Sequence, residues 1–171
     1  MQTSKRLKNP IGKGRFTKVY NHEDSALVYV VSSCVFKECN AFGWLPEGLG
    51  YAYFPTIERI AWAIDDKGNS LYTMQKYPKL TSPKKQLNSM AYATYKTLRD
   101  VFHAFVGIQK IWDKQKKLES LTLDIALKNF LVEVLDATTN HSDSACFEIS
   151  PRNVSYDDEG NLVLLDVIFK R

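Results

Sequence analysis

The segment that decides the fold is residues 146–169, which read CFEISPRNVSYDDEGNLVLLDVIF. Two short apolar runs, Cys146–Ile149 and Leu162–Phe169, enclose a polar stretch with a cluster of turn-forming residues at Asp157–Asn161. Short apolar runs separated by such a cluster are typical of antiparallel strands joined by a turn. The segment therefore predicts a small β-hairpin near the C-terminal end of the chain.

Near the other end, residues 12–20 read GKGRFTKVY, a G-x-G-x-F-x-x-V-Y string. Glycine has no Cβ, so backbone N–H groups beside it can approach phosphate oxygens closely. The string predicts a β-hairpin whose tip is capped by Phe16 and in which Val19 lies against a base. Two glycines in a hairpin also have a purely structural reading, as a turn and nothing more. The candidate cofactor-binding residues are Gly12, Gly14, Phe16 and Val19.

The pattern of apolar residues changes near residue 81, from strand-like to helical. Apolar runs bounded by turn residues predict strands at 26–31, 54–64 and 71–77, a hairpin turn at 65–69 and a short helix at 36–45. Helical periodicity then predicts a long helix over about 88–115, capped at Ser89, and a second over about 118–135, followed by a polar loop at 138–144. This order is that of an α+β protein.

Together, the glycine string and the terminal segment resemble the protein-kinase-like superfamily. In the kinase catalytic loop, H-R-D-x-x-x-x-N, the catalytic Asp precedes the Asn by five residues, and a metal-binding Asp follows after a short hairpin. Here Glu148 precedes Asn153 by five residues, and Asp166 follows Asn153 by thirteen, the common kinase separation. The resemblance implies that Glu148 is the catalytic base and that Asn153 and Asp166 bind Mg²⁺.

The likeness extends over roughly residues 11–169 to the short early serine/threonine kinases of podovirus-type bacteriophages. That family has a similar glycine-rich opening, and an F-D-x-x-x-x-N loop where this chain has Phe147–Asn153. The resemblance implies a two-lobed kinase-like fold, with a small N-terminal β lobe over residues 1–80 and a truncated helical lobe over 81–171. The glycine hairpin would lie over the cleft between the lobes.

Several departures from the kinase pattern weaken the catalytic reading. Kinases carry a phosphate-binding Lys on the third strand, but Tyr29 occupies that place here, and Lys18 and Lys37 are the remaining candidates. Strand parity puts Lys18 on the face away from Val19. Glu148 is one methylene longer than the Asp it replaces, and misplacing a base by about 1 Å can cost roughly 10²-fold in rate.

The segment after Asp166 contains five residues and no activation segment. From this and the missing Lys we expect ATP and Mg²⁺ to bind weakly or not at all.

Composition sets the outer limits on function. The 171 residues are 44% hydrophobic and 12% aromatic, which excludes a disordered chain, and the net charge of +4 argues against nucleic acid as the partner. No apolar run approaches the ~18–20 residues of a membrane span, so we expect no membrane partner. Cys34, Cys39 and Cys146 form no C-x-x-C pair, which favours reduced thiols, no zinc site and a cytoplasmic protein, in the host cytoplasm if viral.

Three functions remain open from the sequence. The first is a degenerate, pseudokinase-like viral protein that binds a host protein and modulates it, as in host takeover or an anti-defence role, with a second copy of the chain as a further candidate partner. The second is an active, minimal ATP-dependent serine/threonine kinase. The third is an unrelated α+β interaction module in which the kinase spacing arose by chance.

Overall fold

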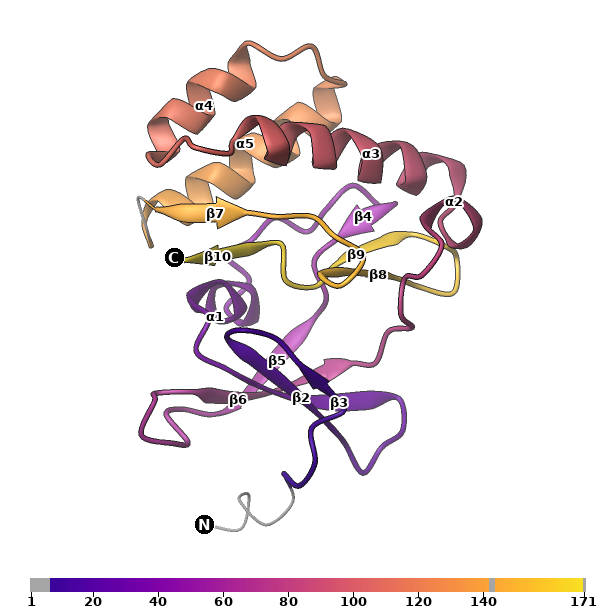
Figure 1. Ribbon diagram of the computed structural model, residues 1–171, viewed down its shortest axis with the longest axis vertical. Helices are drawn as coiled ribbons and strands as arrows, with labels where there is room; N and C mark the ends of the chain where they lie inside the picture. Colours follow the sequence, from indigo (N-terminus) through magenta and orange to yellow (C-terminus); the bar gives the residue numbers. More distant parts are fainter. Residues whose placement is uncertain (1–6, 142–143, 171) are drawn as a thin grey trace. The chain divides into compact units, whose positions relative to one another are not determined.

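The computed structural model describes residues 7–141 and 144–170 (Figure 1). The predicted α+β class is confirmed, since strands and helices both contribute extensively and occupy largely separate parts of the chain. The chain divides into two compact units, one of residues 1–42 and 56–76, the other of residues 43–55 and 77–171. The predicted division at residue 80 differs from this one mainly in residues 43–55, which belong to the second unit.

The first unit is built on one five-stranded antiparallel sheet in the order β1-β2-β3-β6-β5. Its elements are β1 (Gly12–Lys13), β2 (Thr17–Asn21), β3 (Leu27–Ser32), α1 (Val35–Ala41), β5 (Ile57–Ala61) and β6 (Ser70–Gln75). β3 is the central strand and pairs along its whole length with β6. The strands and the 65–69 turn predicted for this region are confirmed, although β5 begins three residues later than expected, after Pro55.

Both faces of this sheet are covered by apolar side chains. Directly opposite residues of an antiparallel pair share a face, so the pairs Tyr20–Tyr29 and Val31–Leu71 mark one side. Tyr20, Val31 and Leu71 form a buried cluster there, with Leu7 and Ile64 packed against it. The opposite face buries Val28, Val30, Tyr72 and Met74. The alternation along β3 thus places apolar side chains on each face of the sheet.

The second unit combines helices with two small sheets. Its helices are α2 (Pro83–Gln86), α3 (Ser89–Ala104), α4 (Ile111–Glu119) and α5 (Ile125–Thr139). One sheet has the order β4-β9-β8, from β4 (Ala52–Tyr53), β8 (Val154–Tyr156) and β9 (Leu162–Leu164), and the other pairs β7 (Ala145–Phe147) with β10 (Ile168–Lys170). β4 pairs with β9 in parallel, and this pairing explains why residues 43–55 group with the second unit.

The predicted helix over 88–115 is wrong, because two helices occupy that region. α3 ends at Ala104, and Gly107 adopts a φ of +84° before α4 begins at Ile111. Glycine takes this left-handed conformation readily and commonly ends helices. The cap of α3 is Asn88 rather than Ser89, since the Asn88 side chain accepts a hydrogen bond from the Ala91 N–H.

The second predicted helix, over 118–135, is also displaced. α5 begins at Ile125, because the Asp124 carboxylate accepts hydrogen bonds from the N–H groups of Ala126 and Leu127. It continues through Thr139, whose hydroxyl donates to the Leu135 carbonyl. The predicted polar loop at 138–144 therefore begins later than expected, and residues 142 and 143 of that loop lie outside the described residues.

The predicted terminal hairpin is confirmed in part: the 157–161 turn joins two antiparallel strands, but the strand before it is β8 rather than the predicted run 146–149, whose β7 pairs with β10. Asp157 closes this turn by accepting hydrogen bonds from the N–H groups of Glu159 and Asn161 and from the Tyr53 hydroxyl. Burial raises the pKa of the Asp157 carboxyl, but these hydrogen bonds outweigh it and leave the pKa below its usual range. The run expected as one strand over 162–169 is two strands, because β10 leaves β9 to pair with β7.

Gly160 lies where this turn packs against the start of α3, so a substitution there measures how closely the two backbones approach. Its φ is +75°, and a Cβ at this position would lie 2.9 Å from the backbone nitrogen of Asn88. Gly50, in the same unit, has a nearly equal φ of +74° and open space around it. Gly50→Ala should cost about 1–2 kcal/mol from the left-handed backbone alone, and Gly160→Ala should cost a further ~1–3 kcal/mol from overpacking.

Urea unfolding of the two variants measures the difference. Equal losses of unfolding free energy in Gly160→Ala and Gly50→Ala would show that the turn does not pack against the α3 backbone as described.

Candidate functional site

The glycine string forms the β-hairpin that the sequence predicts. β1 and β2 are antiparallel, with Gly12 opposite Val19 and Lys13 opposite Lys18. The Gly14 N–H donates to the Thr17 carbonyl at 2.8 Å and closes the tip around Arg15 and Phe16. Gly12, Gly14, Phe16 and Val19 thus belong to one hairpin of the first unit, and their role in binding a nucleotide stays a prediction.

The strand register decides which side chains share a face with Val19. Val19 lies opposite Val30 on β3, whereas Tyr29 lies opposite Tyr20 on the other face. The Tyr29 hydroxyl donates to the Glu23 carboxylate at 2.7 Å. On the Val19 face, β3 therefore presents Val30 and Val28 rather than Tyr29, and neither side chain carries a charge.

The two lysines considered as substitutes occupy different environments. Lys18 lies opposite Val31 and shares its face, so it lies on the face away from Val19, as strand parity predicts. Lys37 lies on α1 with only 6% of its surface exposed. A buried ammonium group requires hydrogen-bonding or charged partners, so its position is fixed by its surroundings. A phosphate-binding role for Lys37 stays a prediction, because its side chain is buried on α1.

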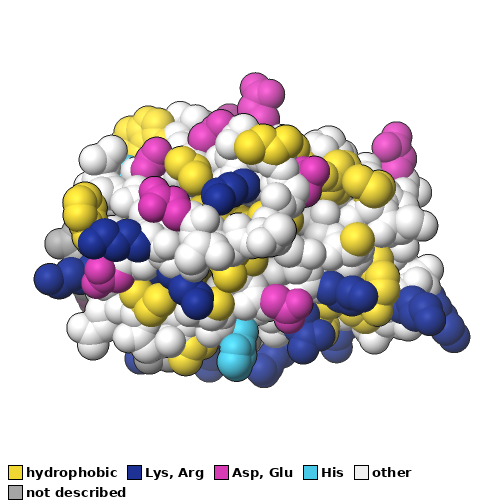
Figure 2. Space-filling model, turned by 90° about the horizontal axis from the view of Figure 1, so that it is seen from above, with side chains coloured by type: hydrophobic (Ala, Val, Ile, Leu, Met, Phe, Trp, Pro, Cys, Tyr) yellow, Lys and Arg dark blue, Asp and Glu magenta, His cyan; other side chains and the backbone are white. Residues whose placement is uncertain are grey.

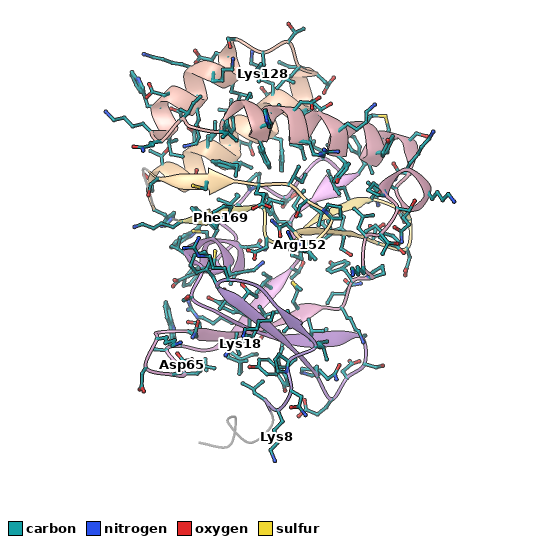
Figure 3. All side chains as sticks on the ribbon, viewed as in Figure 1. Lys8, Lys18, Asp65, Lys128, Arg152 and Phe169 are labelled. Atoms are coloured by element: carbon teal, nitrogen blue, oxygen red, sulfur yellow. The ribbon has the colours of Figure 1, made fainter. Side chains whose placement is uncertain are left out.

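In the second unit, backbone hydrogen bonds bring the three predicted catalytic-type residues into one short region. The Asn153 carbonyl accepts hydrogen bonds from the N–H groups of Leu165 and Asp166, at 3.0 and 2.9 Å. The Glu148 N–H donates to the Val167 carbonyl at 3.0 Å. Asn153 and Asp166 are half-buried, and Glu148 is exposed. The loop that joins β7 to β8, which includes Arg152 (Figure 3), is thus held against the segment between β9 and β10.

Asn153 and Asp166 carry side-chain oxygen atoms that could bind Mg²⁺, but only as a small part of its ligand shell. Mg²⁺ prefers oxygen ligands and is commonly held by one or two carboxylates together with substrate phosphates and waters. Among the described residues, no group of three or more His, Cys, Asp or Glu side chains could hold a metal ion. Any Mg²⁺ here would thus depend on Asn153, Asp166 and a phosphate-bearing ligand.

Sequence reasoning did not identify Ser150, which lies in the same loop. Its Oγ is buried and has no hydrogen-bond partner among the described residues. Leaving a buried hydroxyl without a partner costs roughly 1–3 kcal/mol. No feature of the sequence signals this, because the burial of one hydroxyl depends on how the loop packs. Ser150 is thus a buried polar group in the loop between Glu148 and Asn153.

The three cysteines are free thiols; Cys146 lies two residues before Glu148, whereas Cys34 and Cys39 belong to the first unit. Cys34 and Cys39 are buried, and burial raises the pKa of the Cys39 thiol to about 11. A thiol with this pKa is almost entirely protonated near neutral pH, so Cys39 is a poor nucleophile.

Comparisons with known proteins give no family to which the chain can be assigned. No family model matches the sequence, and no curated protein is similar to it. Over residues 7–141 and 144–170, no helix combines the length and the apolar character needed to cross a membrane.

Gly12 and Gly14 should be dispensable for folding. Neither adopts a positive φ, and a Cβ would meet ordinary contacts, 3.5 Å from the Val19 Cβ at Gly12 and 3.7 Å from the Thr17 carbonyl at Gly14. We expect Gly12→Ala and Gly14→Ala to change stability by about 1 kcal/mol or less, with stabilisation allowed. The matched control is Gly68→Ala, where φ is +70°, at an expected cost of about 1–2 kcal/mol.

Denaturant unfolding of the three variants checks this. A loss in Gly12→Ala or Gly14→Ala as large as that in Gly68→Ala would mean that the backbone itself demands glycine in the hairpin.

Proposed function

We propose that this chain is a degenerate kinase-like protein that acts by binding another protein rather than by transferring phosphate. In the form that the resemblance suggests, it is a viral protein that modulates a host protein. The observation that carries the proposal is the register of β2 and β3, in which Val30 lies beside Val19. An apolar, buried side chain there cannot supply the cation that kinases use on the third strand.

The terminal segment supports kinase-like ancestry. The spacing of Glu148, Asn153 and Asp166 is the kinase spacing, and the backbone hydrogen bonds of Asn153 bring the last two residues side by side. Phosphoryl transfer depends on positioning and charge stabilisation, so all its parts must be present together. Keeping the ligand residues while losing the phosphate cation is the pattern expected of a protein that has given up catalysis.

The surface supports protein binding. In the first unit, the Arg59 guanidinium lies 3.4 Å from the centre of the Trp62 ring and pairs with Glu38 at 3.3 Å, while Trp62 is 58% exposed. In the second unit, Trp112 is 64% exposed on α4. Trp and Arg are the residues most enriched at the energetic centres of protein interfaces.

On the face that Figure 2 shows, hydrophobic side chains alternate with charged ones and form no single broad apolar area. Scattered exposed apolar residues are ordinary on soluble proteins, so the exposed tryptophans carry more weight than the apolar area as a whole. The surface is therefore suited to a partner that engages a few large side chains.

ATP should bind weakly. A charge-assisted contact of the kind that Lys makes to phosphate contributes roughly 1.5–3 kcal/mol, so its absence at Val30 should lower the affinity about ten- to a hundredfold. Calorimetry with ATP and Mg²⁺ measures this in the full chain and in Lys18→Ala and Lys37→Met, the second chosen to keep the buried volume. Micromolar ATP binding that survives in both variants would contradict the proposal.

The biological effect should survive removal of the catalytic-type carboxylates. The double variant Glu148→Ala/Asp166→Ala should keep partner binding and the effect of the protein on the host cell. Because the proposed protein transfers no γ-phosphate, the variant and the original chain should give the same background level of phosphate transfer. The matched control is Asp100→Ala/Glu133→Ala, which removes two exposed carboxylates from α3 and α5. Thermal unfolding checks that both variants fold.

A different outcome would favour an active minimal serine/threonine kinase. The buried, unpartnered hydroxyl of Ser150 between Glu148 and Asn153 is the observation that favours this second candidate, because ligand sites hold such groups. If the host effect disappears in Glu148→Ala/Asp166→Ala while partner binding and folding persist, the kinase function is correct and the binding function is wrong.

A further inference from the structure

A cavity of about 430 Å³ lies in the first unit, between the tip of the glycine hairpin and the turn that joins β5 to β6. The hairpin contributes Lys13, Arg15 and Lys18, and the turn contributes Lys67. Two carboxylates, Asp65 and Asp66, complete the charged lining. Figure 3 labels Lys18 on β2 and Asp65 at the turn. The cavity thus gathers four cations from two hairpins that are far apart in the sequence.

This cavity is not the place where the kinase resemblance puts a nucleotide. Lys18 lies opposite Lys13 on β1 and opposite Val31 on β3, and Val31 also lines the cavity. Val19 lies opposite Gly12 and Val30, on the other face of the sheet. Because side chains alternate between faces along a strand, the lysine cavity and the Val19 face are separate surfaces.

The lysine pair is an unfavourable arrangement unless an anion compensates it. Lys13 and Lys18 are directly opposite residues of an antiparallel pair, and like charges in that position repel each other. Nothing in the fold of β1 requires this, since both side chains are exposed. A ligand with negative charge would turn the repulsion into attraction for both ammonium groups.

The carboxylates of the cavity leave a surplus of positive charge. Asp65 closes the β5–β6 turn by accepting hydrogen bonds from the Asn69 side chain and from the N–H groups of Lys67 and Asn69. Its oxygens therefore accept hydrogen bonds from the turn, and its charge also interacts with that of Lys67. Four cations against two carboxylates, 4 − 2, leave a formal surplus of two positive charges in the lining.

We propose that this cavity binds a phosphomonoester group. A phosphomonoester carries about −1.5 to −2 charges near pH 7 and three strong acceptor oxygens, which matches both the surplus and the cluster of donors. The cavity volume falls within the ~300–1,000 Å³ of ordinary ligand sites. The Phe16 ring, 5.2 Å from the Arg15 guanidinium, supplies an apolar wall beside the cations. The proposal does not depend on the kinase-like function.

The test uses the full chain at low ionic strength and isothermal titration calorimetry with O-phosphoserine. The double variant Lys13→Gln/Lys18→Gln removes the opposed pair, and Lys84→Gln/Lys85→Gln removes two exposed lysines from α2 in the second unit as a matched control. We expect the first variant to lose at least about tenfold in affinity and the control to lose less than about twofold. Lys18→Gln alone should also raise the thermal midpoint without ligand, since it removes the repulsion.

Two probes identify the source of the phosphomonoester. A short peptide with one phosphoserine is compared with its unphosphorylated form and with free O-phosphoserine. Tighter binding of the phosphopeptide assigns the site to a phosphoprotein, and equal binding assigns it to a small molecule; either result supports the proposal. Absence of O-phosphoserine binding up to about 10 mM, equal losses in both double variants, or tighter binding of a single-stranded RNA of equal charge would overturn it.

Discussion

The carbonyl oxygen of Asn153 accepts two backbone N–H groups at once, and the candidate site of the second unit depends on this contact. β8, β9 and β10 have three residues each, so few hydrogen bonds hold their register. A slip of one residue would turn every side chain of a strand to its other face. The bonds from Leu165 and Asp166 prevent this slip where β9 gives way to β10, and they fix Asp166 next to Asn153.

Strand parity has the same importance in the first unit. β3 alternates between Val28 and Val30 on one face and Tyr29 and Val31 on the other. The hairpin formed by β1 and β2 follows this alternation, so Lys13 and Lys18 share one face and Gly12 and Val19 share the other. The basic residues of the strands therefore lie on the face that also buries Tyr20 and Val31.

The sequence predicted the features that depend on hydrogen bonds and turn residues close together in the chain. The turns at 65–69 and 157–161 follow from Asp, Asn and Gly residues whose hydrogen bonds lie within the turn itself, and the glycine hairpin follows from its own short pattern. The spacing of Asn153 and Asp166 agrees with the backbone hydrogen bond between them, while a shared metal site there stays a prediction. These features depend on residues close in the chain, or on one hairpin.

The sequence did not predict the elements that depend on contacts between residues far apart in the chain. β4 has two residues and exists because it pairs with β9, more than a hundred residues later, so no local pattern marks it. The break between α3 and α4 was missed because apolar residues keep their helical spacing across Gly107. The unpartnered Ser150 hydroxyl and the opposition of Lys13 and Lys18 are also products of packing and register, which composition does not reveal.

Gly12 and Gly14 provide evidence about the function of the hairpin formed by β1 and β2. Gly12 and Gly14 have φ values open to any residue, and a Cβ would fit at both, so folding alone does not account for glycine there. What a Cβ would still obstruct is the approach of another molecule to the backbone. The basic residues on the Lys18 face provide a reason for such an approach, since they repel one another in the free protein. The Val19 face provides none for phosphate, because the residue opposite Val19 is the uncharged Val30. The charge of the hairpin therefore favours an anion on the Lys18 face of the sheet.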